Sequence, residues 1–396
     1  MRVYLKEDHS WPLVSIQTWL RAGSIDEEES QAGISHALEH MVFKGTDRHA
    51  ASGISRWMES LGGSLNAETS REYTHYFVDL PSAGSREAIS LLGEMMHRAT
   101  FPPEEWQRER FVILEEMKRR NDDPDALLWD LLSQAIYSER RLSRPVIGTP
   151  ETVKNLSREE LAGYYHDRYN AARCILVAAG DLNPRKMLAW ITTAFRGMPA
   201  GREVQRPQLA ASRPAMRDLK IKKPVKQSYL ALALPTPPSS SADHEALDLL
   251  ATILGEGRSS RLVSSLREKK KIAWSIHAGN ITHEGPGIFA IFAECDPQKR
   301  ALLGREIGGH FSMLLRRPPA RHEIERAKNI ILNSWLQSFE SYHNQASIIG
   351  LFAVEDRLDR LENYVDKIAG LTGSQLKPVI NRYFHPDALS SAVVEN

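Results

Sequence analysis

Two histidines and a glutamate lie within five residues of one another near the start of the sequence, in the order His36-Ala37-Leu38-Glu39-His40. Imidazole nitrogen is a preferred ligand of Zn²⁺, and a catalytic zinc site keeps one coordination position open for water. Residues four positions apart share a helix face, so His36 and His40 can bind one ion. Glu39 lies beside them and can reach a metal-bound water without ligating the metal. The order His-x-x-Glu-His, which inverts the commoner zinc-peptidase signature, therefore predicts a catalytic metal site.

A third ligand is expected from the segment 103–121, whose sequence predicts an amphipathic helix. Glu109 and Glu116 are seven residues apart, or two helical turns, and so lie on one face. One carboxylate would bind the metal, and the other would hydrogen-bond a histidine and fix its tautomer. The residues alone do not separate Glu109, Glu115 and Glu116, although Glu115 is expected to be solvated. The side that meets the core is predicted to include Val112, Ile113 and Met117.

Regular elements must hold these residues in place, and the surrounding sequence predicts them. Apolar residues between Gly33 and Gly45 predict a short buried helix that carries the His-x-x-Glu-His order. Strands are predicted at 14–23, 74–81, 227–235 and 287–295, and amphipathic helices at 84–98, 103–121, 157–168, 243–254, 320–340 and 342–354. Strand pairs followed by helices favour an α+β fold, with helices packed on mostly antiparallel sheets.

Two correspondences indicate that the chain is duplicated. The segments 101–117 and 317–335 both contain a Pro pair, a Glu-Arg pair and an apolar helical stretch, at an offset of 216. Arg168-Tyr169 and Arg382-Tyr383 each precede an apolar strand, at an offset of 214. The near-equal offsets favour two homologous domains, predicted at 1–199 and 217–396. The Pro-, Arg- and Ala-rich stretch between them, 200–216, is predicted to be a linker.

The overall composition is that of an ordinary globular protein and excludes several classes. Lys and Arg number 51 against 50 Asp and Glu. The net charge is therefore too small to attract nucleic acid or an anionic membrane to the molecule as a whole. No apolar stretch approaches the roughly 20 residues that span a bilayer. Cys174 and Cys295 are far apart in sequence and are expected to be buried free thiols. These features predict a cytoplasmic protein that binds neither nucleic acid nor a membrane.

Three stretches carry a resemblance to a known family: QAGISHALEHMVFKGT (31–46), LGGSLNAETSREYTHYFVDLP (61–81) and ERFVILEEMKRR (109–120). They resemble the pitrilysin and insulin-degrading enzyme family of zinc peptidases, and most of all its short bacterial members and the mitochondrial processing peptidase. The likeness covers nearly the whole chain, including GEGRSSRLVSSLREKKKIAWS (255–275). It implies a zinc-dependent endopeptidase that hydrolyses peptides or unfolded segments inside a closed chamber.

The resemblance assigns roles to particular residues of the first half. It implies that Glu116 is the third metal ligand and that Glu109 is the supporting carboxylate. Glu39 would be the general base, which takes the proton of the attacking water and passes it to the leaving amine. Asn66 and Ala67 fall where the family presents an edge strand that pairs with the peptide substrate.

The second half departs from the first and from the family in ways that bear on metal content and partners. Leu332 stands at the position that corresponds to Glu116, so one Zn²⁺ per chain is implied. Family members usually carry an Arg and a Tyr seven residues apart there, which bind the substrate carbonyl and the tetrahedral oxyanion. This chain has Arg267, but Trp274 stands in place of the Tyr. In short family members this pair reaches the zinc from a partner subunit. We therefore expect either a homodimer that uses Trp274 or a heterodimer with a related subunit that carries an intact Arg/Tyr pair.

Other readings stay open from the sequence. The same fold serves as a non-catalytic structural subunit of respiratory complexes, but such subunits have typically lost the zinc ligands that this chain keeps. Trp274 leaves room for a scaffold that binds zinc without turnover. Family members also enter the first strand through an Asn-Gly turn a few residues before the position of Arg2. Since this chain opens at Met1, an upstream export signal is compatible with the sequence.

Overall fold

The structure, a computed structural model, describes residues 1–202, 206, 209 and 217–396 of the 396-residue chain. The chain forms two compact units. Unit 1 comprises Met1–Lys118, Pro145–Arg206 and Ser338–Leu361, and unit 2 comprises Arg119–Arg144, Pro207–Gln337 and Glu362–Asn396. The linker predicted at 200–216 falls largely outside the described residues, and the predicted domain limits of 1–199 and 217–396 stay a prediction.

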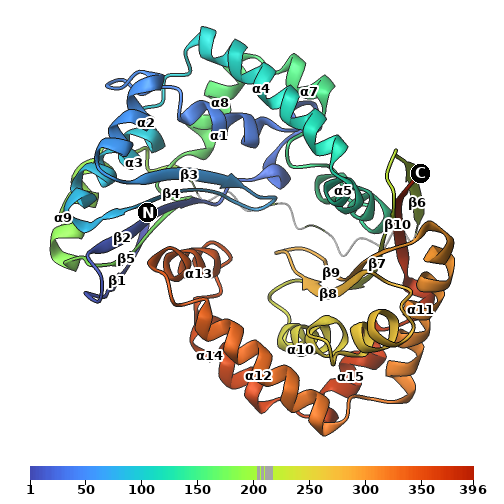
Figure 1. Cartoon of the computed structure of the whole chain (residues 1–396). Coiled ribbons are helices and arrows are strands. Elements are labelled where there is room, and N and C mark those ends of the chain that lie inside the picture. The colour runs from blue at the N-terminus through green and yellow to red at the C-terminus, as the bar shows by residue number, and fades with distance from the viewer. Residues whose placement is uncertain (203–205, 207–208, 210–216) are drawn as a thin grey trace. The chain divides into compact units, whose positions relative to one another are not determined.

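Unit 1 is built on a five-stranded sheet with the strand order β1-β5-β2-β4-β3 (Figure 1). Its strands are β1 (Arg2–Glu7), β2 (Leu13–Leu20), β3 (Ser64–Thr69), β4 (Thr74–Pro81) and β5 (Cys174–Gly180). β1 runs parallel to β5, and the other neighbouring pairs are antiparallel. β3 therefore lies at an edge of the sheet and, among the described strands, pairs on one side only.

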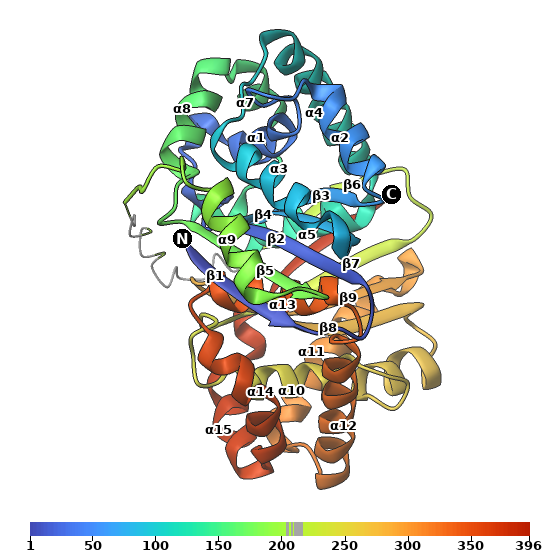
Figure 2. The ribbon, with the colours of Figure 1, turned by 90° about the vertical axis from the view of Figure 1, so that its left-hand side faces the viewer.

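Alternation along the strands gives this sheet two different faces. Val14, Ile16 and Leu20 of β2 point into a core that the sheet forms with helices, whereas Trp19 belongs to a cluster on the opposite face. The helices of the first face, seen in Figure 2, are α1 (Ile34–Val42), α2 (Ala51–Ser60), α3 (Ser85–His97), α4 (Pro103–Asp122), α7 (Pro150–Asn155), α8 (Arg158–Arg168) and α9 (Pro184–Ala194).

Unit 2 repeats this arrangement with the strand order β6-β10-β7-β9-β8. Its strands are β6 (Asp218–Lys222), β7 (Ser228–Thr236), β8 (Ser275–Ile281), β9 (Gly287–Cys295) and β10 (Ser390–Glu395). Here too the first pair, β6 and β10, is parallel and the others are antiparallel. Helices α10 (His244–Gly255), α11 (Arg300–Arg316), α12 (Arg321–Gln337) and α15 (Gly373–Tyr383) share its core. The matching order and directions confirm the predicted duplication of an α+β domain.

The two halves of the sequence exchange a helix. α13 (Tyr342–Val354), from the second half, packs on β2 and β5 of unit 1, where a Cβ at Gly350 would lie only 2.1 Å from Nε1 of Trp19. α5 (Pro124–Ile136), from the first half, packs on β7 and β10 of unit 2. The remaining α-helices are α6 (Arg140–Ser143) and α14 (Leu358–Gly370). The sequence did not predict this exchange.

The structure also bears on two predictions from composition. Within the described ranges, no helix combines the length and the apolar character needed to cross a bilayer. Cys174 and Cys295 are buried free thiols, as predicted. Burial raises the pKa of Cys295 to about 11, so this thiol stays protonated at neutral pH.

His75 lies in an aromatic row on β4. Its ring stacks on Trp19 with the centroids 4.1 Å apart and on Phe77 with the centroids 5.2 Å apart. The side chain is only 6% exposed. Burial, with a smaller contribution from His343, lowers the pKa of His75 to about 4. His75 is therefore a neutral core residue at pH 7.

We expect acid to destabilise unit 1 through His75. Its pKa is about 6.5 in the unfolded chain and about 4 in the folded one, so the unfolded state binds more protons as the pH falls through this window. The free energy of unfolding should fall by about 3 kcal/mol between pH 7 and pH 4. His75→Phe keeps the stacked ring and should flatten the dependence of the melting temperature on pH. Parallel curves for the variant and the wild type would contradict this.

Candidate metal centre

α1 begins where a buried carboxylate holds its first backbone amides. Gly33, which precedes the helix, has a φ of 94°, and a Cβ there would lie 2.5 Å from the carbonyl oxygen of Ile147. The backbone N–H groups of Gly33 and Ser35 donate to the two carboxylate oxygens of Glu27 at 3.0 and 2.9 Å. Because the first amides of a helix have no acceptor within it, Glu27 fixes the start of α1.

The side chains of α1 divide into a buried and a partly exposed set. Its apolar residues are fully buried in the core of unit 1, as the sequence predicted. His36, Glu39 and His40 are the partly exposed residues of the helix. The rings of His36 and His40 lie on one side with their centroids 4.8 Å apart, as their spacing of four residues requires.

His36, His40 and Glu116 come together where α1 and α4 meet. One donor atom of each lies within 4.8 Å of the others, and the described residues contain no other such group. Nε2 of His36 is 3.7 Å from one carboxylate oxygen of Glu116, and Nε2 of His40 is 3.5 Å from the other. Ligands bound at about 2.0–2.1 Å to a tetrahedral zinc lie about 3.3 Å from each other. This donor set therefore fits a Zn²⁺ ion.

Glu109 lies behind His40, with a lysine on its other side. Its carboxylate is 3.0 Å from Nδ1 of His40 and 2.8 Å from Nζ of Lys44. Burial raises the pKa of Glu109, but His40 and Lys44 outweigh that effect and lower it below its ordinary value. Sequence reasoning did not single out Lys44. The signal that could have found it is its place four residues after His40, near the end of α1.

The same surroundings favour a positive charge at His40. Burial lowers the pKa of this imidazole, but the carboxylates of Glu109, Glu116 and Glu39 outweigh burial and raise it to about 9. Without a metal, the protonated imidazole balances part of this negative charge, and a bound metal ion would take over that part. The electrostatics of the site therefore agree with its geometry.

Glu39 points to the edge strand β3. The hydroxyl of Thr69 donates a hydrogen bond to the Glu39 carboxylate. Burial raises the pKa of Glu39 above its ordinary value, and the hydrogen bond from Thr69 opposes that shift. Thr69 was missed in the sequence, although strand alternation puts it on the same face as Leu65 and Ala67, both of which pack toward the helices. Thr69 orients the candidate base.

α4 presents both predicted carboxylates to α1, but one of its apolar residues departs from the prediction. Ile113 and Met117 are buried, whereas Val112 is 44% exposed. Val112 lies three residues after Glu109 and four before Glu116, so it shares their face rather than that of the core. The prediction that Val112 meets the core is therefore wrong, and an apolar side chain stands exposed beside the metal site.

Asn66 and Ala67 lie on β3, as the resemblance implied. Asn66 is exposed, and its side-chain oxygen accepts a hydrogen bond from the backbone N–H of Ala67 at 2.9 Å. In an unpaired edge strand, alternate amides point away from the sheet and need an acceptor. Their role in binding a substrate stays a prediction.

Arg267 and Trp274 both lie in unit 2. Arg267 is part of a π-helical segment, Val263–Lys269, and its guanidinium contacts Glu268 at 2.8 Å. Trp274 is 50% exposed, and its backbone N–H donates to the carbonyl oxygen of Glu294 at 2.7 Å. π-Helical turns are rare and are frequent at functional sites. The roles predicted for Arg267 and Trp274 stay predictions.

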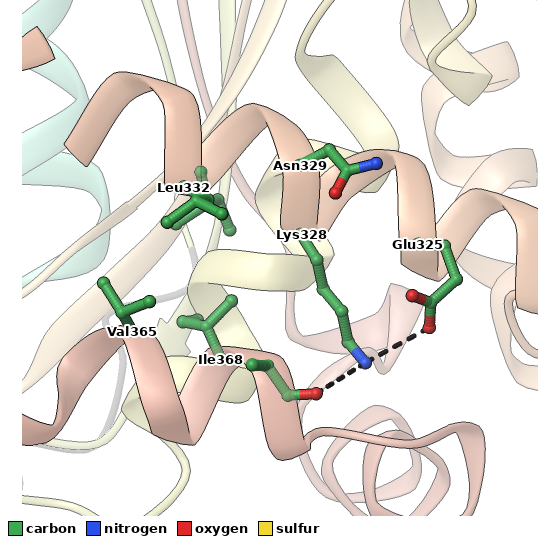
Figure 3. A pocket seen from close by; sticks show the side chains of 8 residues that line it. Glu325, Lys328, Asn329, Leu332, Val365 and Ile368 are labelled. Carbon is green, nitrogen blue, oxygen red and sulfur yellow. Dashed lines mark hydrogen bonds and ion pairs between the residues drawn. The ribbon is translucent and has the colours of Figure 1, made fainter. Parts of the chain in front are cut away.

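The position in unit 2 that corresponds to the metal site lacks a donor set. α12 repeats α4, so Glu325 corresponds to Glu109 and Leu332 to Glu116. Figure 3 shows Leu332 with Val365 and Ile368 at a small pocket where α12 faces α14. Lys328 bonds Glu325 at 3.2 Å and the carbonyl oxygen of Ala369 at 2.8 Å. Glu325 contacts a lysine as Glu109 does, but Leu332 offers no ligand atom where unit 1 has Glu116.

Comparison with known proteins assigns the chain to a family. The family described as "Insulinase (Peptidase family M16)" matches residues 2–150, and "Peptidase M16 inactive domain" matches residues 155–331. The chain is 30% identical over 379 residues to the "Uncharacterized zinc protease YmxG" of Bacillus subtilis. The match covers 93% of this chain and 90% of that protein. The chain therefore belongs to the insulinase family, peptidase family M16, and the resemblance read from its motifs is confirmed.

Solved structures share the whole fold. A protease from Helicobacter pylori matches with a TM-score of 0.91 at 24% identity, over 99% of this chain and 96% of that chain. A chain of Complex III2 from Candida albicans matches with a TM-score of 0.84 at 15% identity, over 99% of this chain and 93% of that chain. At these identities the likeness establishes the fold and leaves the activity to the site.

Proposed function

We propose that this chain is a zinc-dependent endopeptidase that hydrolyses peptides or unfolded segments. The observation that carries the proposal is the convergence of His36, His40 and Glu116, beside a Glu39 carboxylate that Thr69 holds at an edge strand. Relatives named as zinc proteases support it. Two imidazoles and one carboxylate are a usual ligand set of catalytic zinc in peptidases.

His36, His40 and Glu116 would hold one Zn²⁺ per chain, and Glu109 would keep the His40 ring in the tautomer that leaves Nε2 free to bind. When bound, zinc supplies a Lewis acid that polarises the scissile carbonyl and makes water more acidic. Lys44 keeps Glu109 ionised and oriented toward Nδ1 of His40.

Glu39 would move the protons of the reaction. Its carboxylate takes a proton from the attacking water and returns it to the amine that leaves. The hydroxyl of Thr69 occupies one side of this carboxylate and fixes its direction. The other carboxylate oxygen would accept the proton of the water and then pass it to the leaving nitrogen.

The edge strand β3 would bind the substrate as an added strand. The N–H of Ala67 donates to the side-chain oxygen of its neighbour Asn66 at 2.9 Å, and a substrate carbonyl can replace that acceptor. Backbone pairing of this kind reads an extended conformation and suits peptides and unfolded segments, because a folded substrate rarely offers a free strand.

We further propose that the chain acts as a dimer, either with a second copy or with a related subunit that carries an intact Arg/Tyr pair. Arg267 and Trp274 stand at the positions of that pair here, and an indole N–H donates from a different reach than a phenol. Two buried unpaired thiols, Cys174 and Cys295, suit a reducing compartment, so a cytoplasmic location is part of the proposal.

A non-catalytic subunit is the competing function, because the fold also occurs in a chain of Complex III2 from Candida albicans. The complete donor set and the adjacent carboxylate favour the peptidase. The test is to measure zinc content and the cleavage of a mixed library of unfolded peptides by the isolated chain. We expect one zinc per chain, and cleavage that a chelator abolishes and added zinc restores. Zinc without cleavage would direct the search to a partner subunit, and a chain without zinc would refute the proposal.

A further inference from the structure

β3 presents a different set of side chains on each of its faces. Leu65, Ala67 and Thr69 are partly buried and face the helices that carry the metal site, whereas Ser64, Asn66 and Glu68 are exposed on the other face. Glu68 is the only charged residue of the exposed set and directly precedes Thr69. Because Thr69 bonds Glu39, Glu68 lies on the edge strand at the level of the candidate base.

The carboxylate of Glu68 has no cationic partner in the described part of the chain. This carboxylate lies 4.0 Å from Nδ1 of His75. Burial lowers the pKa of His75 to about 4, so this ring is neutral at pH 7 and does not balance the charge. Burial also raises the pKa of Glu68 itself, and no nearby cation offsets that shift. The side chain nevertheless stays 60% exposed.

Strand pairing places a substrate side chain next to this carboxylate. Neighbouring strands lie about 4.8 Å apart, and residues opposite each other on one face have Cβ atoms about 4.5–5.5 Å apart. A peptide added to β3 alternates its side chains in the same way, so one residue near the scissile bond must lie on the face of Glu68. A lysine or arginine there reaches the carboxylate, whereas an aspartate or glutamate meets a like charge.

We propose that Glu68 is a specificity-determining residue that selects peptides with a lysine or arginine within two residues of the cleaved bond. The inference rests on the proposed function for its substrate class and on the edge position of β3 for its geometry. The inference needs no contact between the basic side chain of the substrate and any other residue of unit 1.

The test separates binding from turnover. Peptide-library cleavage first locates the position where basic residues are enriched, and three peptides are then made with Lys, Gln or Glu at that position. Their dissociation constants are measured on the zinc-loaded Glu39→Gln chain, with Glu68 intact, with Glu68→Gln and with Glu68→Lys. If the library yields no cleavage, peptides that carry the substitution at successive positions of an extended decapeptide serve instead.

With Glu68 intact, the Lys peptide should bind about threefold to tenfold more tightly than the Gln peptide, and this ratio should shrink as salt rises. In Glu68→Gln the ratio should fall to about one, and in Glu68→Lys the Glu peptide should bind best. Glu115→Gln is the matched control, because Glu115 is exposed one residue from Glu116 but paired with Lys118. It should keep the wild-type ratio.

Equal binding of the three peptides, or the same ratio in all Glu68 variants, would overturn the inference. Cleavage by the wild-type chain would then still support the proposed function. Charge selection in binding without any cleavage would support the role of Glu68, and the missing cleavage would direct the search for activity to a partner subunit.

Discussion

Glu39→Gln should leave one zinc ion bound per chain and lower kcat for peptide cleavage by about 10²- to 10⁴-fold, the usual range for loss of a general base. Glutamine has nearly the same shape and can still accept the hydrogen bond from Thr69. It cannot take a proton from water at neutral pH. The loss should therefore fall on kcat, while KM for the peptide changes little.

Metal analysis and steady-state kinetics on the same preparations check this expectation. Glu115→Gln removes a carboxylate from the exposed side of α4 and should change neither quantity. A Glu39→Gln chain that cleaves peptides at the wild-type rate would show that another group moves the proton. A chain that loses its zinc would instead assign Glu39 to the metal.

Glu116→Gln and Glu109→Gln should weaken zinc binding to very different extents. Glu116 offers its oxygens at 3.5 and 3.7 Å from the two histidine nitrogens, so its loss removes one of three ligands. We expect more than about a 100-fold loss of zinc affinity. Glu109 supports His40 from behind, and loss of such a supporting carboxylate typically costs about 10- to 100-fold.

Competition with a chromophoric chelator measures both affinities, with Glu115→Gln as the control on the same helix. Circular dichroism of each variant verifies that α4 remains folded. If Glu109→Gln lost more affinity than Glu116→Gln, the two carboxylates would have exchanged roles. Equal small losses in both would place the third ligand elsewhere.

The fold and the members of the metal site could be predicted because they depend on local patterns. The spacing of four between His36 and His40, and of seven between Glu109 and Glu116, are helical periods that the structure reproduces. The predicted strands agree with β4 and β9 at both ends and with β7 to within one residue, whereas the strand predicted at 14–23 extends three residues beyond β2. The near-constant offset between the halves anticipated two sheets with one strand order.

What escaped prediction depends on contacts between segments far apart in sequence. Thr69 contacts Glu39 because β3 lies beside α1. The local sequence of β3 does not indicate that α1 is its neighbour. Lys44 gains its role from Glu109 on another helix. Val112 was assigned to the core from periodicity alone, which cannot distinguish a face that meets the core from one that meets a site.

The exchanged helices α5 and α13 are the arrangement expected if the chain arose by joining two copies of one domain. A single ancestral copy would have left one face of its sheet bare, with Trp19 and its apolar neighbours in water, unless a second copy supplied the covering helix. Two such copies that swap helices form a symmetric homodimer. Joining the two genes end to end would preserve every one of those contacts, with α5 and α13 still crossing between the former subunits. The second copy could then lose its metal ligands, in agreement with Leu332 at the position of Glu116. Its helix α13 would still cover the sheet of unit 1.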